Sequence, residues 1–171
     1  MPDPLRVVII GTAARSSYLY GPLLAALSEV ELVSVWGRSV DSARKLGESL
    51  GVPWYTELEK LKRETSPQIA SVSVAYHANG EAGLMAVESG LHVLLETPIA
   101  HRLSEANAII AAAQARGLKI EVAEQFHRRP ARTDQAQAVG EWLIRTRLLI
   151  VQRFRRAWLS RCECDAQLPG L

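Results

Sequence analysis

The chain has 171 residues, 48% of them apolar, and its 20 Lys and Arg nearly balance its 18 Asp and Glu. This length supports one domain with a full core, or one domain with part of a second, and the even charge argues against a protein built around nucleic acid. The two cysteines, Cys162 and Cys164, cannot build a disulfide framework or a thiolate zinc site, and no stretch approaches the roughly 18 apolar residues that span a bilayer, so we expect a cytoplasmic protein without a membrane segment.

The first strand and helix come directly at the N-terminus. Residues 5–10 (LRVVII) are a β-branched run that ends at Gly11, a pattern typical of a strand buried on both faces of a parallel sheet. A helix follows, and it should begin between Ser16 and Gly21 because Pro22 is tolerated only near a first turn or at a kink. A buried strand that leads into a helix is the first half of a βαβ unit.

A second strand and helix repeat this pattern. Residues 31–36 (ELVSVW) predict the strand, while Ser39 is placed to cap the next helix and Gly51 to end it. The expected inward face of this helix consists of Ala43, Leu46 and Leu50. A short extended piece near residues 53–55 and a polar helix over residues 57–64 come next.

The alternation continues to about residue 123. Residues 69–75 (IASVSVA), 92–96 (HVLLE) and 119–123 (KIEVA) predict three further strands. Asn79 and Ser104 are placed to cap the two helices between them. The expected inward faces are Ala82, Met85 and Ala86 in the first helix and Ala106, Ile109, Ile110 and Ala113 in the second. Five or six strands alternating with helices predict an α/β fold with a doubly wound parallel sheet, Rossmann-like.

The last third differs in character. Residues 133–144 can form a helix, and residues 147–158 have the apolar density of a strand with no later partner. We therefore expect a first domain over residues 1–124 and, over residues 125–171, a linker helix and the truncated start of a second α+β domain. The six arginines between Trp142 and Arg161 are the alternative, a nucleic-acid patch, but apolar residues interleave with them as in a strand.

The loop after the first strand is a candidate phosphate site, because ligands of such sheets bind beyond the carboxyl ends of the strands. Gly11 opens a stretch that occupies the place of a G-x-G-x-x-G loop but keeps only its first glycine. Gly11 permits the tight turn and Ala13 is small enough for a diphosphate to approach, whereas Ser16 loosens the contact between helix and strand. The alternative is a plain turn from strand to helix with no ligand.

The end of the second strand bears on the choice of cofactor. A carboxylate there commonly binds the ribose 2′-OH of NAD, whereas an arginine accommodates the 2′-phosphate of NADP. This chain has Arg38 and Ser39, with no acidic residue before Asp41. Arg38 could pair with a phosphate and Ser39 could add a hydroxyl donor, which favours NADP. The alternative is an exposed arginine at a helix N-terminus.

A longer stretch resembles a known family. The run from Glu88 to Ala100 (ESGLHVLLETPIA) closely resembles the segment around the Glu-Lys-Pro motif of the Gfo/Idh/MocA oxidoreductases. The likeness extends to the Ser-Val-Ser-Val-Ala strand upstream and to residues 121–128 (EVAEQFHR) downstream, so it covers about residues 5–145. It implies a Rossmann domain followed by a second α+β domain, with oxidation or reduction of sugars, polyols and related small molecules by NAD or NADP.

The resemblance also implies site residues, position by position. The cofactor contacts that it implies are Gly11, Thr12, Ala13, Arg38, Ser39, Ala75, Tyr76 and Glu96. NADP is the expected cofactor, with NAD as the alternative. Thr97 stands where the family has a lysine near the nicotinamide and the substrate, and His77 lies at a strand exit where a histidine could shuttle a proton. These two residues are the catalytic candidates.

Departures from the family pattern fall on the catalytic side. Threonine at position 97 has a hydroxyl but no charge, and losing a charged contact of this kind lowers the rate by about two powers of ten. The family's Thr-Pro-Asn is replaced here by Ala75, Tyr76 and His77, and its following histidine by Gly80. Two functions therefore stay open: an NAD(P)-dependent oxidoreductase acting on a sugar- or polyol-like molecule, and a non-catalytic dinucleotide-binding or scaffold protein that has lost the lysine and the substrate domain.

Expected partners follow from these interpretations. The oxidoreductase would take a small-molecule substrate, and either a second copy or another chain could cover the strand near residues 148–151. Nucleic acid and membrane are not expected partners. Of the remaining histidines, His92 opens a strand and is interpreted as structural.

Overall fold

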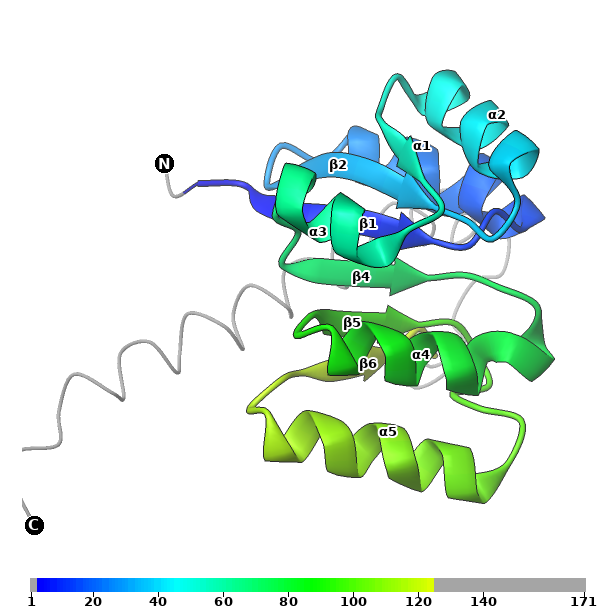
Figure 1. The fold of residues 1–171 in the computed structure, drawn as a ribbon, viewed down its shortest axis with the longest axis vertical. Helices are drawn as coiled ribbons and strands as arrows, with labels where there is room; N and C mark the ends of the chain where they lie inside the picture. Colours follow the sequence, from blue (N-terminus) through cyan, green and yellow to red (C-terminus); the bar gives the residue numbers. More distant parts are fainter. Residues whose placement is uncertain (1–2, 125–171) are drawn as a thin grey trace, which may run out of the picture. The chain divides into compact units, whose positions relative to one another are not determined.

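The structure, a computed structural model that describes residues 3–124, places six parallel strands in one sheet with the order β3-β2-β1-β4-β5-β6 (Figure 1). The strands are β1 (Leu5–Ile10), β2 (Val30–Trp36), β3 (Trp54–Tyr55), β4 (Ile69–Val72), β5 (His92–Leu95) and β6 (Ile120–Val122). This order confirms the doubly wound, Rossmann-like sheet. The winding reverses between β1 and β4, so the ligand crevice is expected at the carboxyl ends of these two strands.

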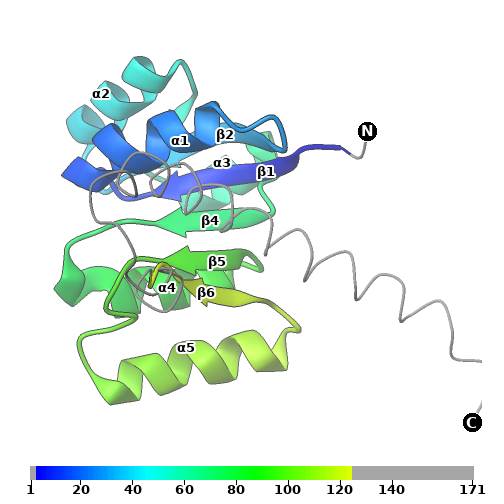
Figure 2. The same ribbon diagram turned by 180° about the vertical axis from the view of Figure 1, so that it is seen from behind.

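Helices lie on both faces of the sheet, as Figures 1 and 2 show. They are a π-helical turn η1 (Ser16–Tyr20), α1 (Gly21–Ala25), α2 (Val40–Leu50), α3 (Leu58–Thr65), a 3-10 turn η2 (Tyr76–Ala78), α4 (Asn79–Glu88) and α5 (Leu103–Ala115). The helices α1 and α2 lie on one face and α3, α4 and α5 on the other. This is the arrangement that right-handed crossovers produce on either side of a reversal.

The first helix begins with a wide turn. The N–H of Gly21 donates to the carbonyl oxygen of Ser16, five residues earlier, so the turn is π-helical. The next residue, Pro22, has no N–H, and its ring would clash with the carbonyl four residues back in a regular α-helix. The expected start between Ser16 and Gly21 is confirmed, and Pro22 accounts for the local widening.

Two of the four expected helix signals before β6 are confirmed and two are wrong. Ser39 caps α2 and Gly51 ends it in the left-handed conformation. Asn79 lies inside α4, whose N-cap is Ala78, because its side chain bonds elsewhere. Ser104 lies in the first turn of α5, whose N-cap is Arg102. Ile110 was expected to face inward but is 41% exposed.

The main core lies between the sheet and the helices α3, α4 and α5. It consists of buried aliphatic and alanine residues of the central strands and of the three helices. Its members include Val8, Ile10, Leu61, Ala70, Val72, Ala86, Val87, Val93, Leu95, Ile109 and Ala113. A rigid central sheet of this kind fixes the positions of the loops at its carboxyl edge, where the candidate site lies.

Several expectations fall outside the described residues. These are the loop, helix and strand expected after residue 124, the second-domain boundary, the arginine-rich stretch over residues 142–161, the partner surface near residues 148–151 and both cysteines. They stay predictions. Within residues 3–124, no helix is both long enough and apolar enough to cross a membrane.

Candidate functional site

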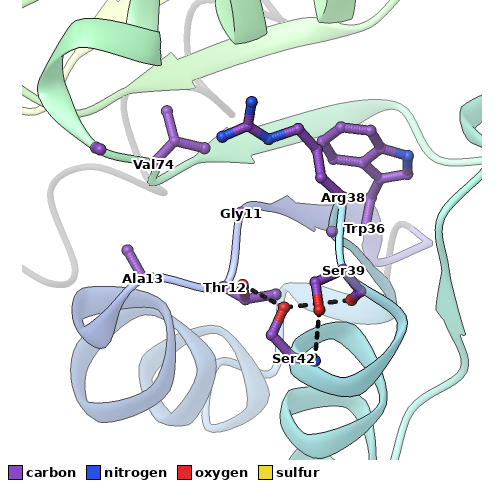
Figure 3. A pocket seen from close by; sticks show the side chains of 10 residues that line it. Gly11, Thr12, Ala13, Trp36, Arg38, Ser39, Ser42 and Val74 are labelled. Carbon is purple, nitrogen blue, oxygen red and sulfur yellow. Dashed lines mark hydrogen bonds between the residues drawn. The ribbon is translucent and has the colours of Figure 1, made fainter.

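A cavity of about 240 Å³ lies at the carboxyl ends of β1, β2 and β4, where the winding reverses (Figure 3). Its walls are Gly11, Thr12, Ala13, Trp36, Gly37, Arg38, Ser39, Ser42, Val74 and Ala75. Pockets that hold a whole ligand usually measure about 300–1,000 Å³. The cavity is therefore large enough for part of an extended ligand rather than for a whole one.

Two glycines in the wall of this cavity allow the backbone to lie close to a neighbouring segment. Gly11 has a φ of +106°, and a Cβ there would lie 2.3 Å from the carbonyl oxygen of Ser73. A Cβ at Gly37 would lie 2.8 Å from the methyl carbon of Thr12. Both glycines are therefore required by the packing of the protein itself, whether or not a ligand is bound.

Ala13 and Ser16 stand where the G-x-G-x-x-G pattern has its second and third glycines, and neither side chain fills the cavity. Ser16 is fully buried, and its hydroxyl donates to the carbonyl oxygen of Ser73 at 3.2 Å, so it packs against the end of β4 and does not line the cavity. Ala13 does line the cavity, and its single methyl group leaves the volume beside Gly11 open. The residues present therefore fit a diphosphate, which would approach the backbone of this loop.

Three hydroxyl groups connect the loop after β1 to the start of α2 (Figure 3). Thr12 Oγ1 donates to Ser42 Oγ at 3.1 Å, and Ser42 Oγ donates to the carbonyl oxygen of Ser39 at 3.2 Å. The N–H of Ser42 donates to Ser39 Oγ at 3.5 Å, which caps the helix. This cluster gives one wall of the cavity hydroxyl groups beside the N-terminus of an 11-residue helix, where anions are stabilised.

Arg38 contributes the positive charge of the cavity. Its side chain is exposed, and in Figure 3 it extends from the end of β2 toward Val74 on the opposite wall. Among residues 3–124 it forms no ion pair, whereas the nearest following acid, Asp41, is paired with Arg44 at 3.3 Å. The end of β2 therefore presents a guanidinium, and no carboxylate lines the cavity.

Glu96 lies directly after β5 and outside the cavity walls. Its carboxylate is buried and accepts three hydrogen bonds: from Arg15 Nη1 at 2.5 Å, from the hydroxyl of Tyr20 at 2.6 Å and from the N–H of Thr97 at 3.1 Å. The Glu96 carboxylate raises the pKa of Arg15 above its ordinary value. Burial, and then the bond to Glu96, raises the pKa of Tyr20. The three donors to the Glu96 carboxylate are all groups of this chain, so the carboxylate is hydrogen-bonded without a ligand.

The two catalytic candidates lie at the exits of β4 and β5, also outside the cavity walls. Thr97 is exposed, and Asn79 Nδ2 donates to the carbonyl oxygens on either side of it, those of Glu96 at 3.0 Å and Pro98 at 2.8 Å. His77 is exposed beside Tyr76, whose ring also lies 5.5 Å from that of His101, centroid to centroid. The loops after β4 and β5 thus contact each other at the carboxyl edge of the sheet.

The cavity brings together most of the expected cofactor contacts. Those that line it are Gly11, Thr12, Ala13, Arg38, Ser39 and Ala75, while Tyr76, Glu96, Thr97 and His77 lie elsewhere along the edge. Sequence reasoning missed the lining residues Trp36, Gly37, Ser42 and Val74 and the Glu96 donors Arg15 and Tyr20. Ser42 could have been found from its spacing of three residues after the expected N-cap. The Glu96 donors had no signal, because they lie 81 and 76 residues away from it.

Comparison with known proteins bears on this geometry. Residues 5–124 match the Gfo/Idh/MocA family, described as an oxidoreductase family with an NAD-binding Rossmann fold. D-glucoside 3-dehydrogenase of Escherichia coli is 29% identical over 128 residues, which is 74% of this chain and 36% of that protein. The scyllo-inositol 2-dehydrogenase (NADP(+)) of Bacillus subtilis is 23% identical over 127 residues, 74% of this chain and 34% of that protein.

A similar solved structure carries a cofactor. The crystal structure of a 3-ketoreductase from Actinomadura kijaniata, in complex with TDP-benzene and NADP, has a TM-score of 0.65 and 25% sequence identity, and the similarity covers 74% of this chain and 42% of that one. The chain spans about a third of the length of the curated relatives that it matches. The similarity therefore concerns one domain of longer proteins.

Proposed function

Since the chain belongs to the Gfo/Idh/MocA oxidoreductase family, with its NAD-binding Rossmann fold, we propose that residues 5–124 bind NADP(H) for hydride transfer to or from a sugar- or polyol-like small molecule. The names of two relatives, a glucoside dehydrogenase and an inositol dehydrogenase, support that substrate class. The observation that carries the choice of NADP is the guanidinium of Arg38, which stands at the cavity wall where an NAD-binding site would present a carboxylate.

The residues of the cavity suggest how the cofactor would be held. The backbone of the loop from Gly11 to Ala13 would face the diphosphate, and Arg38 and Ser39 would bind the 2′-phosphate by charge and by a hydroxyl donor. The nicotinamide ring supplies the chemistry, because it accepts or donates the hydride. The exposed His77 imidazole, at the exit of β4, is the side chain that we propose to exchange a proton with the substrate.

Titration with NADPH and NADH tests the cofactor assignment. Trp36 lines the cavity, so its fluorescence should change as NADPH binds. The Arg38→Gln substitution removes a charged hydrogen bond, and we expect it to weaken NADPH binding about 10- to 100-fold while changing NADH binding little. The control is Arg44→Gln, which removes an arginine of α2 that does not line the cavity. Equal binding of NADPH by the Arg38 variant and the wild type would contradict the NADP assignment.

A second candidate function is favoured by one observation. Thr97 is exposed beside the buried Glu96 but has no charged group to hold a substrate oxygen. This observation supports the second candidate function, a non-catalytic dinucleotide-binding or scaffold protein. The two functions differ in turnover and share cofactor binding, so the substitution of Thr97 described in the Discussion distinguishes them.

A further inference from the structure

If the proposed cofactor binding holds, hydride transfer takes place outside the cavity, in a second half of the sheet's carboxyl edge. We call the exits of β4 and β5 the catalytic half of this edge. A doubly wound sheet binds one mononucleotide at each of its two halves. The cavity belongs to the half formed around β1 and β2, with Arg38 and Ser39 in its wall. The nicotinamide end must then lie over the exits of β4 and β5, where Glu96 and Thr97 follow the strand. The inference below rests on this placement.

A guanidinium from a distant part of the chain lies at this exit. Arg15 belongs to the loop that follows β1, yet its Nη1 donates to Glu96 Oε2 at 2.5 Å. The same oxygen accepts the N–H of Thr97 at 3.1 Å. The Arg15 guanidinium and the backbone of Thr97 are therefore neighbours around a single carboxylate oxygen.

The two sides of this ion pair are unequally exposed. The Glu96 side chain is 9% exposed, and its other oxygen is held by the hydroxyl of Tyr20 at 2.6 Å. The Arg15 side chain is 52% exposed; its Nη1 donates to Glu96, and the neighbouring Tyr18 side chain also interacts with the guanidinium. A buried carboxylate, hydrogen-bonded at both oxygens, thus anchors a guanidinium that is still half exposed to solvent.

We infer that Arg15 is a ligand-binding residue of the catalytic half, whose guanidinium binds an anionic or polarised oxygen of the molecule beside the nicotinamide ring. The oxygen of the reacting hydroxyl or carbonyl group of a sugar-like substrate is of this class. Because arginine stays protonated, it acts through charge and hydrogen bonds and transfers no proton. Thr97, its neighbour, carries no charge that could do the same.

Addition of sulfite to bound NADP⁺ tests this inference without a known substrate. Sulfite adds at the C4 carbon of oxidised nicotinamide and leaves an anionic group beside the ring, and the near-ultraviolet absorbance of the adduct reports how tightly it is held. We expect Arg15→Gln to weaken sulfite binding about tenfold or more, since a charged contact is lost, while the affinity for NADPH changes less than about twofold. Arg15→Lys keeps the charge and should retain part of the sulfite affinity.

Arg44 supplies the matched control, because it is also ion-paired and its side chain is 53% exposed against 52% for Arg15. Arg44→Gln should leave sulfite binding unchanged, and thermal melting checks that each variant is folded. Sulfite binding that is indifferent to residue 15, or a parallel loss of NADPH and sulfite affinity, would overturn the inference while leaving the cofactor assignment intact. A wild type that binds no NADPH would overturn the proposed function, and this inference with it.

Discussion

The hydroxyl of Ser16 donates to the carbonyl oxygen of Ser73 at 3.2 Å, in a place with no exposure to solvent. A glycine at this position would allow the helix to approach the strand, whereas the serine fills the same space and adds a hydrogen bond. The departure from the glycine pattern is therefore accommodated within the packing between the first helix and β4. The cavity beside Gly11 stays open as a result.

The Ser16→Ala substitution should destabilise the protein by about 1–3 kcal/mol, because it leaves a buried carbonyl oxygen without its donor. Urea unfolding measures the change. Ser17 is the control, because its hydroxyl donates to the carbonyl oxygen of Ala14 at the exposed surface. Ser17→Ala should change the stability by less than about 0.5 kcal/mol. Equal effects of the two substitutions would contradict the role of Ser16.

Gly11→Ala should be more damaging than Gly51→Ala. Both glycines have positive φ values, +106° and +67°, but a Cβ at Gly11 would overlap the backbone of Ser73, whereas a Cβ at Gly51 meets nothing within 4 Å. We expect a loss of about 3 kcal/mol or more at Gly11 and about 1 kcal/mol at Gly51. Urea unfolding of the two variants side by side is the measurement, and a similar cost at both positions would speak against the close approach.

Asn79 should be needed for the loop that carries Thr97. Its side chain is 1% exposed and donates to the carbonyl oxygens of Glu96 and Pro98, so Asn79→Asp would place carboxylate oxygens against two acceptors. We expect a loss of about 3 kcal/mol or more on unfolding in urea. Asn107→Ala, on the exposed side of α5, should be nearly neutral. A stable Asn79→Asp variant would show that these two bonds contribute little.

His92 should make the stability depend on pH. Its Nδ1 accepts the N–H of Lys119 at 3.0 Å, and burial, followed by the charge of Lys119, lowers the pKa of His92 below its ordinary value of 6.5. The folded protein therefore favours the neutral ring. The contribution to stability is complete above pH 6.5 and is lost as the pH falls through the lowered pKa, because the unfolded chain then takes up the proton more readily.

His92→Asn tests this dependence, because the Asn oxygen can accept the same N–H but does not titrate. Urea unfolding between about pH 5 and 8 should show a smaller loss of stability on acidification in the variant than in the wild type. A second variant, Lys119→Gln, keeps the backbone donor, removes the charge and should reduce the dependence in part. Identical pH profiles for wild type and His92→Asn would rule out the histidine as the source.

Thr97→Lys should raise turnover without changing cofactor binding. If the wild type lacks only a charged group at this position, lysine should increase the rate of polyol oxidation with NADP⁺ by about a hundredfold. Thr97→Met is the control, since it adds length without charge. Steady-state rates and the NADPH titration are measured on the same samples. A rate that stays at the wild-type level in both variants would favour the non-catalytic candidate function.

The doubly wound parallel sheet could be predicted because short apolar runs, such as residues 5–10 and 69–75, alternate with stretches of helical pattern along the chain. The prediction of helix starts was less successful at Asn79 and Ser104. An asparagine before a helix matches a cap in sequence, but the partners of Asn79 are carbonyl groups 17 and 19 residues away, which local patterns do not reveal. Ile110 fits the apolar repeat of its helix, but its position leaves it at the surface.

The cavity could be predicted more fully than the surroundings of Glu96 at the exit of β5. Its walls come from the ends of strands whose position follows from the alternation, so Gly11 and Arg38 could be placed there from the sequence pattern, and Ala75 from the family resemblance. The surroundings of Glu96 depend on Arg15 and Tyr20, which meet it only in the folded chain. Contacts across such separations depend on packing, and the sequence carries no periodic signal for them.

The π turn explains how two side chains five residues apart reach one carboxylate. In a regular α-helix, residues 15 and 20 would point in clearly different directions, since neighbours on one face are three or four apart. A turn with a five-residue bond brings this spacing close to a single face, and both side chains meet Glu96. A chain with one residue fewer in this turn would lose the spacing that brings both side chains to Glu96, so an insertion or deletion here would alter the electrostatics at the exit of β5 without any substitution of Arg15, Tyr20 or Glu96.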